Sequence, residues 1–365
     1  MYTFFRQIFC ALHQRLSALQ KQRALVAMLS LTLCCNLSAA PAAALELDAY
    51  FFSDSYTSAA WAAHDLEQLC RLEGGTLNLT FGHNQRFELE RILREKNDSG
   101  SIFIVYPRDL DDVAAAVHYA GSNSSAVIFL GTDPGGRAAD YPAAWYIGTE
   151  GRDAGAALYD LIANYLKEVP NWDLNGNGRL DLVVLRDKAD SQEESAMLKT
   201  LKARLKKADL SYSQLYDAVP AAEVSRLQAG HDLLSEYVRD HADESIDLVL
   251  CLNDELAVGA VQALQDLGWG GAAPAPRTGV FAVGASRQVL ELVAQGTIQG
   301  AVLQDAHKIA VTALALAHLI AAGIPEDNYS ASLGVPVKQR RISLPHLKIT
   351  GKLAPYLLNL PAIPQ

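Results

Sequence analysis

The sequence predicts an α/β protein with two doubly wound parallel sheets. Short apolar runs alternate with longer helical patterns almost to the end of the chain, which is the order expected of repeated strand–helix–strand units. Most of the short runs are continuously apolar, as in strands that helices cover on both faces. A chain of 365 residues built this way divides more naturally into two domains than it folds as one.

The expected strands are runs enriched in Val, Ile, Leu and Phe, at 49–52, 77–80, 102–105, 126–130, 182–185, 248–252, 280–283 and 300–303. The segments between them repeat apolar residues three and four positions apart, as at Leu256, Val258, Val261 and Leu264. A ligand of open parallel sheets lies beyond the carboxyl ends of the strands. The candidate site is therefore formed by the residues directly after the strands, at 53–56, 106–107, 131–133, 186–187, 253–254, 284–285 and 304–305.

The composition and motifs exclude several function classes. The net charge of −10 disfavours nucleic-acid binding, which needs an excess of Lys and Arg on one face. No expected strand is followed by Gly-x-Gly-x-x-Gly or by a Walker lysine, so no nucleotide cofactor is expected. No Ser/His/acid or Cys/His arrangement has motif spacing, and we therefore expect a binding protein and not an enzyme.

Residues 1–44 have the pattern of a cleaved signal peptide. A basic flank ending at Arg23 precedes a short apolar run at 24–33, and a small-residue region ending at Ala44 follows. The run is shorter than the ~20 apolar residues of a membrane helix. We expect cleavage after Ala44 and export to the periplasm. The alternatives are an uncleaved membrane anchor and a lipoprotein modified at Cys34.

Cleavage would leave two cysteines, Cys70 and Cys251, which lie far apart in the sequence. Cys70 falls in a helical pattern and Cys251 in an apolar strand. We expect both to be buried core residues and not a disulfide.

The segment 173–181 has the spacing of the front of a calcium loop. Oxygen-bearing side chains occupy positions one, three and five, a glycine occupies position six, position seven can offer a backbone carbonyl, and position nine is a carboxylate: Asp173, Asn175, Asn177, Gly178, Arg179 and Asp181. A helix–loop–helix site would place Glu at position twelve, where this chain has Val184 inside an expected strand. The remaining ligand must then come from elsewhere. The alternative is an Asn/Gly-rich turn without a metal.

At this loop the sequence resembles the bacterial periplasmic galactose/glucose-binding proteins, which are type I periplasmic sugar-binding proteins of ABC transporters. The similarity extends over most of the mature chain and is carried by 145–149, 171–184, 248–264 and 280–306. The resemblance implies two lobes joined by a three-strand hinge, with crossings near 149–150, 305–306 and 344–345. It implies a first lobe of 45–149 with 306–344, and a second lobe of 150–305 with 345–365.

The resemblance also implies how the calcium site is completed. In the family a carboxylate at the start of the strand before the Asn253-Asp254 pair supplies the missing ligand. Here that residue is Asp247, which is one methylene shorter than the Glu of the family pattern. The implied Ca²⁺ ligands are Asp173, Asn175, Asn177, the carbonyl of Arg179, Asp181 and Asp247.

The resemblance further implies a sugar site in which polar side chains hold the hydroxyls and an aromatic ring stacks on each face of a pyranose. The candidate ligand-binding residues are Asp54, Tyr56, Glu193, Asn253 and Gln304. Several family contacts are replaced, with Gly131 for an Asn, Ala221 for a stacking Trp, Gly284 for an Asp, and Ser191, Glu193 and Met197 where His, Asp and Arg are expected.

Each buried hydroxyl left without a partner costs about 1–3 kcal/mol. We therefore expect weak hexose binding, or a different or bulkier ligand in a pocket enlarged at Gly131, Ala221 and Gly284.

The expected function is capture of a small solute, a carbohydrate by resemblance, between two lobes for an ABC permease or a chemoreceptor. The alternative is a periplasmic sensor-type binding protein with a non-hexose ligand that signals to a membrane partner. We expect a monomer that binds no nucleic acid and has Ca²⁺ as its cofactor. A sugar-responsive repressor is disfavoured because the signal peptide stands where a DNA-binding headpiece would be.

Overall fold

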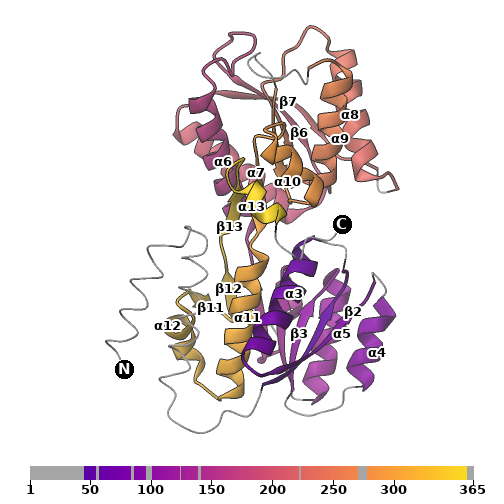
Figure 1. Cartoon of the computed structure of the whole chain (residues 1–365), viewed down its shortest axis with the longest axis vertical. Helices are drawn as coiled ribbons and strands as arrows, with labels where there is room; N and C mark the ends of the chain where they lie inside the picture. The colour runs from indigo at the N-terminus through magenta and orange to yellow at the C-terminus, as the bar shows by residue number, and fades with distance from the viewer. Residues whose placement is uncertain are drawn as a thin grey trace.

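The computed structural model describes residues 45–54, 57–83, 86–95, 101–123, 125–138, 141–221, 223–269 and 278–359. The expected signal peptide 1–44 and the candidate residue Tyr56 lie outside the described residues. The chain forms two sheets with helices around each, and the two bodies are stacked along the long axis of the molecule (Figure 1).

The first sheet has the order β11-β12-β5-β4-β3-β1-β2. Its strands are β1 (Glu46–Phe51), β2 (Thr76–Phe81), β3 (Ile102–Tyr106), β4 (Ala126–Leu130), β5 (Ala144–Gly148), β11 (Val337–Lys338) and β12 (Arg341–Ser343). Its helices are α3 (Thr57–Leu72), α4 (Arg86–Glu95), α5 (Leu110–Asn123), α11 (Ala306–Ala321) and α12 (Tyr329–Leu333), with short 3₁₀ turns at Gly135–Ala138 and Glu326–Asn328. All pairings are parallel except that of β11 with β12.

The second sheet has the order β13-β10-β9-β8-β6-β7. Its strands are β6 (Leu180–Leu185), β7 (Tyr212–Ala218), β8 (Leu248–Cys251), β9 (Gly279–Val283), β10 (Gly300–Gln304) and β13 (His346–Ile349). Its helices are α6 (Gly151–Glu168), α7 (Gln192–Lys207), α8 (Arg226–Asp240), α9 (Asp254–Asp266), α10 (Arg287–Ala294) and α13 (Ala354–Leu358). Only β13 runs antiparallel to its neighbour.

The buried central strands explain the continuous apolar runs of the sequence. Every residue of β3, β4, β5, β6 and β8 is buried, because helices cover both faces of the sheets. The edge strands β2 and β7 are largely half-buried. Cys70 and Cys251 are buried free thiols, as predicted. None of the helices that the structure describes has the length and apolar character of a membrane span.

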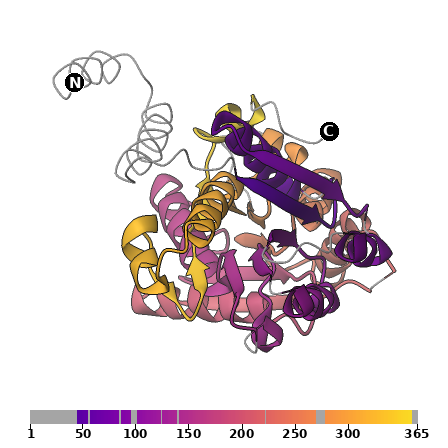
Figure 2. The ribbon, with the colours of Figure 1, turned by 90° about the horizontal axis from the view of Figure 1, so that it is seen from below.

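The chain passes between the two sheets three times, between β5 and α6, between β10 and α11, and between β12 and β13. After the second crossing α11 returns to pack on α3, so that elements from the start and the end of the chain share one body (Figures 1 and 2). After the third crossing β13 pairs with β10, with His346 opposite Gln304.

His346 stands at the third crossing in an environment that disfavours its charged form. Its Nδ1 atom is buried, with no hydrogen-bond partner among the described residues. Burial removes the hydration of the imidazolium and lowers the pKa of His346 from 6.5 to about 4. In the unfolded chain the same side chain takes up a proton near pH 6.5.

His346 should therefore reduce stability as the pH falls from about 6.5 to about 4, because in that interval only the unfolded state binds the proton. Relative to His346→Gln, the wild-type free energy of unfolding should fall by up to about 3 kcal/mol between pH 7 and pH 4. Urea unfolding at several pH values measures this difference. The same substitution at exposed His118 controls for loss of a histidine, and parallel pH profiles of wild type and His346→Gln would contradict the assignment.

Candidate functional site

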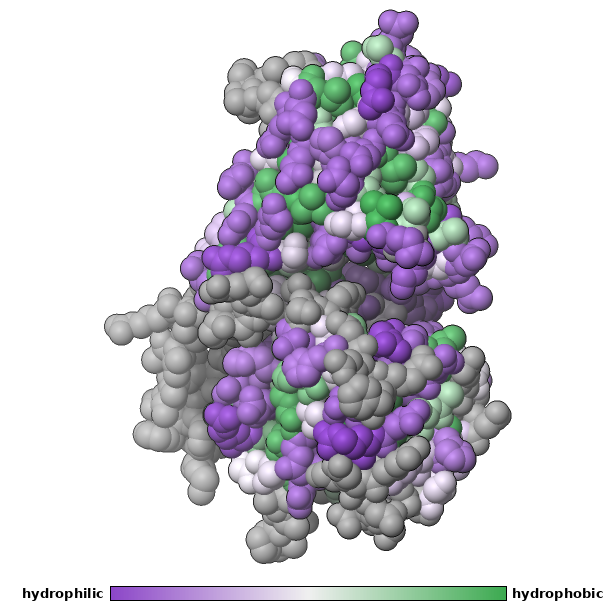
Figure 3. All heavy atoms as spheres, turned by 90° about the vertical axis from the view of Figure 1, so that its right-hand side faces the viewer, coloured by the Kyte–Doolittle hydropathy of each residue, from purple (hydrophilic) through white to green (hydrophobic). Residues whose placement is uncertain are grey.

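The carboxyl ends of the two sheets face each other across the crossings. Tyr106 ends β3 of the first sheet and Gln304 ends β10 of the second, yet the Tyr106 hydroxyl donates to Oε1 of Gln304 at 3.1 Å. On the face shown in Figure 3 a shaded recess lies between the two bodies. The residues that follow the strands of both sheets therefore converge on one region, which is where open parallel sheets bind ligands.

Asn253 and Asp254 come from the end of β8 in the second body. Asn253 is the N-cap of α9, and its Oδ1 accepts from the backbone N–H groups of Glu255 and Leu256 at 2.9 and 3.2 Å. The capping bonds engage its carbonyl oxygen and not its NH₂ group. The carboxylate of Asp254 accepts from the Ser286 N–H at 3.0 Å and so ties the end of β8 to the loop after β9. Burial raises the pKa of Asp254.

Glu193 lies in the first turn of α7, whose N-cap is Ser191. Its side chain is accessible to solvent, yet its pKa is raised, first by loss of hydration and then by the like charges of Glu194 and Asp133. Asp133 follows β4 of the first sheet, so this electrostatic coupling runs between the two bodies. A side chain in a concave site is expected to show this combination, in which the carboxylate is exposed to solvent but has protein on several sides.

The close packing of α6 against α7 holds Glu193 in this position. A Cβ atom on Gly151, the first residue of α6, would lie 2.2 Å from the Glu193 carbonyl oxygen. Only glycine allows this approach, directly after the first crossing of the chain. Met197, one turn further along α7, is 2% exposed and belongs to the core of the second body.

Of the two candidate ligand-binding residues in the first body, Asp54 and Tyr56, the structure describes only Asp54. Asp54 follows β1, and its side chain is 54% exposed with the His83 Nδ1 atom 3.7 Å from its Oδ2. Tyr56 lies outside the described residues. The structure thus brings Gln304 into contact with the opposite body, places Glu193 within electrostatic range of it, leaves Asp54 on an exposed strand end, and makes Asn253 a helix cap.

The expected enlargement of the pocket at Gly131 and Gly284 does not occur. Gly131 has φ +70°, and a Cβ atom there would lie 2.2 Å from Cζ of Tyr106. The tyrosine ring fills the space that the missing side chain leaves. A Cβ atom on Gly284 would similarly lie 3.0 Å from Cβ and Cγ of Asp254. The prediction was wrong at these positions because it considered each replaced contact alone and not the neighbours that move into its place.

Ion pairs that the sequence did not reveal flank the strand ends. Arg341 of β12 forms a two-pronged pair with Asp133 and lies over the ring of Tyr146, with its guanidinium carbon 4.7 Å from the centroid. In the second body Arg186 pairs with Glu194 at 3.2 Å. The partners lie far apart in sequence or on different elements, and no spacing motif links them.

The loop 173–181 closes on itself through its oxygen-bearing side chains. Asp173 accepts from the backbone N–H groups of Asn177 and Gly178 at 3.1 and 2.8 Å, and the amides of Asn175 and Asn177 donate to Oδ2 of Asp181 at 2.9 and 2.7 Å. Gly178 has φ +74°, which lets the loop turn sharply at position six.

Asp247 ties this loop to β8. Its two carboxylate oxygens accept from the backbone N–H groups of Leu174 and Asp181 at 2.9 and 2.8 Å. Asp247 is 1% exposed, and its pKa is raised by burial and by the nearby charges of Asp181 and Asp173. Val184 lies within the buried strand β6 and cannot be a ligand.

The donor set of the loop fits a hard cation. Asp181 is 3% exposed, and its Oδ1 atom is buried with no hydrogen-bond partner among the described residues. Carboxylate, amide and carbonyl oxygens are the ligands that Ca²⁺ takes. Within the described part of the chain, no three or more His, Cys, Asp or Glu side chains are gathered to hold a metal, so Asp173, Asp181 and Asp247 do not form a three-carboxylate cluster by themselves, and a cation here would also need the amide and backbone oxygens.

Comparison with known families agrees with this architecture. Residues 90–325 match the model of the periplasmic binding protein domain. The chain belongs to the periplasmic binding protein family. The predicted recognition and fold class are confirmed, with antiparallel pairs at β10–β13 and β11–β12 as additions to the parallel sheets. Family membership implies a periplasmic location, and relatives of this family are substrate-binding proteins and not enzymes.

Individual members of the family resemble this periplasmic binding protein closely in fold and distantly in sequence. The D-galactose/methyl-galactoside binding periplasmic protein of Haemophilus influenzae is 26% identical over 247 residues, which is 66% of this chain and 70% of the relative. The Caulobacter myo-inositol binding protein bound to myo-inositol has a TM-score of 0.63 at 18% identity, covering 87% of this chain and 97% of its own. A solute-binding protein of Actinobacillus succinogenes with bound D-allose has a TM-score of 0.65 at 14% identity, covering 86% and 99%.

Gly131→Ala should destabilise this periplasmic binding protein more than Gly323→Ala. Both glycines have positive φ, which costs alanine about 1–2 kcal/mol, but only at position 131 would the new methyl group meet the Tyr106 ring. The clash should add about 1–3 kcal/mol, measured by chemical denaturation. In a Tyr106→Leu background the two substitutions should cost about the same. Equal costs in the wild-type background would show that the ring does not fill this space.

Proposed function

We propose that this chain captures a small polyhydroxyl solute, a carbohydrate or a cyclic polyol, between its two lobes and delivers it to an ABC permease. The observation that carries the proposal is the apposition of the carboxyl ends of two parallel sheets, where Tyr106 and Gln304 touch across the gap. The relatives supply the solute class, since the proteins named above bind galactosides or hold myo-inositol or D-allose.

The proposed lobes are 45–149 with 306–344 and 150–305 with 345–365. The distribution of the strands between two sheets supports these boundaries. Closure would occur at the three crossings, as expected for hinge motion between two domains around a ligand.

The proposed solute contacts divide between the lobes. Asp54 and Tyr56 would act from the first lobe, as an acceptor for a hydroxyl and as a stacking ring. Glu193, Asn253 and Gln304 would act from the second. Since the capping bonds engage the carbonyl of Asn253, its amide would donate to the solute. Glu193, held near Asp133, would accept from hydroxyl groups.

The structure favours a solute other than a simple hexose. Tyr106 fills the space at Gly131, and Met197 is buried in the core where the resemblance implies an arginine contact. Two of the implied sugar contacts are therefore absent from the cleft. A sensor or chemoreceptor is the alternative membrane partner, because signalling and transport would use the same closed form.

We further propose export by the signal peptide 1–44, with cleavage after Ala44, and a monomeric mature protein. The pattern of a basic flank, a short apolar run and a small-residue site supports the export signal.

We propose that the loop 173–181 holds Ca²⁺ through Asp173, Asn175, Asn177, the carbonyl of Arg179, Asp181 and Asp247. The buried Oδ1 of Asp181 and the raised pKa of Asp247 support it, because a divalent cation would offset the concentrated negative charge. The ion would supply charge neutralisation and no chemistry. The loop enters β6 at its amino end, whereas the solute contacts lie at the carboxyl ends of the strands. Ca²⁺ would therefore stabilise the second lobe without touching the solute.

A thermal-shift screen tests the solute class. We expect the melting temperature to rise with at least one cyclic polyol, such as myo-inositol, and more weakly with the hexoses D-allose, D-galactose and D-glucose. Binding to the folded state stabilises by mass action, so a solute at 100 times its Kd should add about 2.7 kcal/mol. Calorimetric titration of the solutes that shift the melting temperature measures affinity. Tight D-galactose or D-glucose binding would contradict the non-hexose assignment, and no shift with any sugar or polyol would refute the carbohydrate class.

Chelation tests the calcium proposal. We expect EDTA to lower the melting temperature of the wild-type protein and Ca²⁺ to restore it, because the ion binds only the folded loop. In Asp181→Asn this dependence should be lost or strongly reduced, since a buried carboxylate ligand is replaced by a neutral amide of the same shape. Asp240→Asn, on the exposed end of α8, is the matched control and should keep the wild-type response. A wild-type melting temperature that is indifferent to chelator and Ca²⁺ would refute the metal site.

A further inference from the structure

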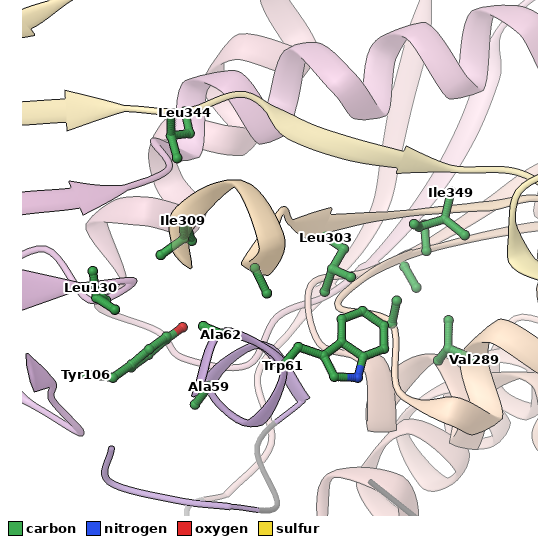
Figure 4. Close-up of a cluster of buried hydrophobic side chains, with 14 of the residues drawn as sticks. Ala59, Trp61, Ala62, Tyr106, Leu130, Val289, Leu303, Ile309, Leu344 and Ile349 are labelled. Carbon is green, nitrogen blue, oxygen red and sulfur yellow. The ribbon is translucent and has the colours of Figure 1, made fainter. Parts of the chain in front are cut away.

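Tyr106 occupies an unusual position at the end of β3. It is 2% exposed although it ends a strand at the cleft edge of the sheet. Its ring packs against Phe51 and Phe52, with centroid distances of 5.8 and 5.9 Å. Figure 4 shows the ring beside Leu130 and Ala59, within the buried apolar cluster. The side chain is therefore held in one orientation by packing on several sides.

Gly131 makes this orientation possible. The glycine directly follows β4, next to β3 in the sheet, and a Cβ atom there would lie 2.2 Å from Cζ and 2.3 Å from the hydroxyl oxygen of Tyr106. No rotamer adjustment of a residue larger than glycine removes an overlap at Cβ itself. The ring of Tyr106 can therefore adopt this position only because residue 131 has no side chain.

The hydroxyl of Tyr106 reaches the other sheet. It donates to Oε1 of Gln304 at 3.1 Å, across a sequence separation of 198 residues. Gln304 ends β10, the strand from which the chain makes its second crossing. The bond therefore joins the two bodies beside the hinge.

Apolar packing accompanies this bond. Trp61 of α3 is 7% exposed, and Figure 4 shows its ring directed toward Leu303 and Val289 of the second body. One contiguous cluster of buried apolar residues includes members of both sheets. The Tyr106–Gln304 bond thus lies at the edge of a buried apolar cluster, where a hydrogen bond is stronger than in water.

We propose that Tyr106 is a positioning residue that joins the two lobes in the solute-free protein and fixes the orientation of Gln304. Because the Tyr106 O–H occupies the amide oxygen, Gln304 presents its NH₂ group to the cleft and acts toward a solute as a donor. The joining of the lobes stands on the geometry alone, whereas the donor role of Gln304 rests on the proposed solute-binding function.

Small-angle X-ray scattering of the solute-free mature chain tests the joining of the lobes. Tyr106→Phe keeps the ring in its packed site and removes only the hydroxyl. We expect it to increase the radius of gyration, because the lobes lose their polar link. Tyr146→Phe is the matched control, since the hydroxyl of Tyr146 donates to the Gly131 and Thr149 carbonyls within the first lobe. The control should lower the melting temperature without changing the radius of gyration.

A double-mutant cycle between positions 106 and 304 tests the pairing itself. Tyr106→Phe should lower the melting temperature of the wild type by a few degrees and change it little in a Gln304→Met background, because the partner is already absent. The proposal is overturned if Tyr106→Phe leaves the scattering of the solute-free protein unchanged, or if its effect on melting is the same with Gln or Met at position 304. Both measurements use solute-free protein, so a failure to bind carbohydrate would refute the proposed function and leave this result standing.

Discussion

The chain passes between the two sheets after β5, after β10 and after β12, and these three crossings hold the carboxyl ends of both sheets against each other. Parallel strands collect the loops that follow them at one edge, so apposed sheets bring two sets of loops together without any dedicated motif. Asp54, Glu193, Asn253 and Gln304 owe their proposed roles to this arrangement. The same crossings restrict the motion of the lobes to rotation about a few backbone segments.

The two chemically distinctive regions of the molecule are set at opposite ends of the strands. The loop 173–181 closes at the amino end of β6, where Asp181 is the second residue of the strand, and Asp247 immediately precedes β8. The proposed solute contacts follow the carboxyl ends of the strands. The proposed role of the loop in stabilising the second lobe is therefore independent of which solute the cleft takes. The combination of an intact loop with replaced cleft contacts is consistent with this separation.

The strands could be predicted from the sequence because burial on both faces leaves an unbroken apolar run. The runs at 126–130 and 300–303 match β4 and nearly match β10. The strand β7 was not predicted, because it is a half-buried edge strand in which Tyr212, Gln214 and Tyr216 alternate with other residues and leave no continuous apolar run. β5 contains Trp145 and Tyr146, which contribute to the resemblance but break the aliphatic pattern.

The cleft was harder to predict than the scaffold. A sequence shows which side chain is lost at a position but not which neighbour fills the space, and Tyr106 beside Gly131 is such a case. The calcium prediction for the loop 173–181 depends on a local pattern, because the candidate ligands other than Asp247 lie within nine residues and their spacing defines the expected geometry; it stays a prediction. Asp247 was assigned by resemblance alone, and its bonds to Leu174 and Asp181 show that it contacts the loop, while its role as a ligand stays a prediction.

The central claim is that solute binds by closing the two lobes on each other. Pulsed electron–electron double resonance between spin labels at Leu110→Cys and Val219→Cys measures this closure most directly. Both side chains are exposed and lie near the cleft edges of opposite lobes. Cys70 and Cys251, the cysteines within the described residues, are buried, which limits their labelling. The account predicts a shorter and narrower distance distribution when a solute from the melting screen is added. A distribution unchanged by a saturating solute would contradict capture between the lobes.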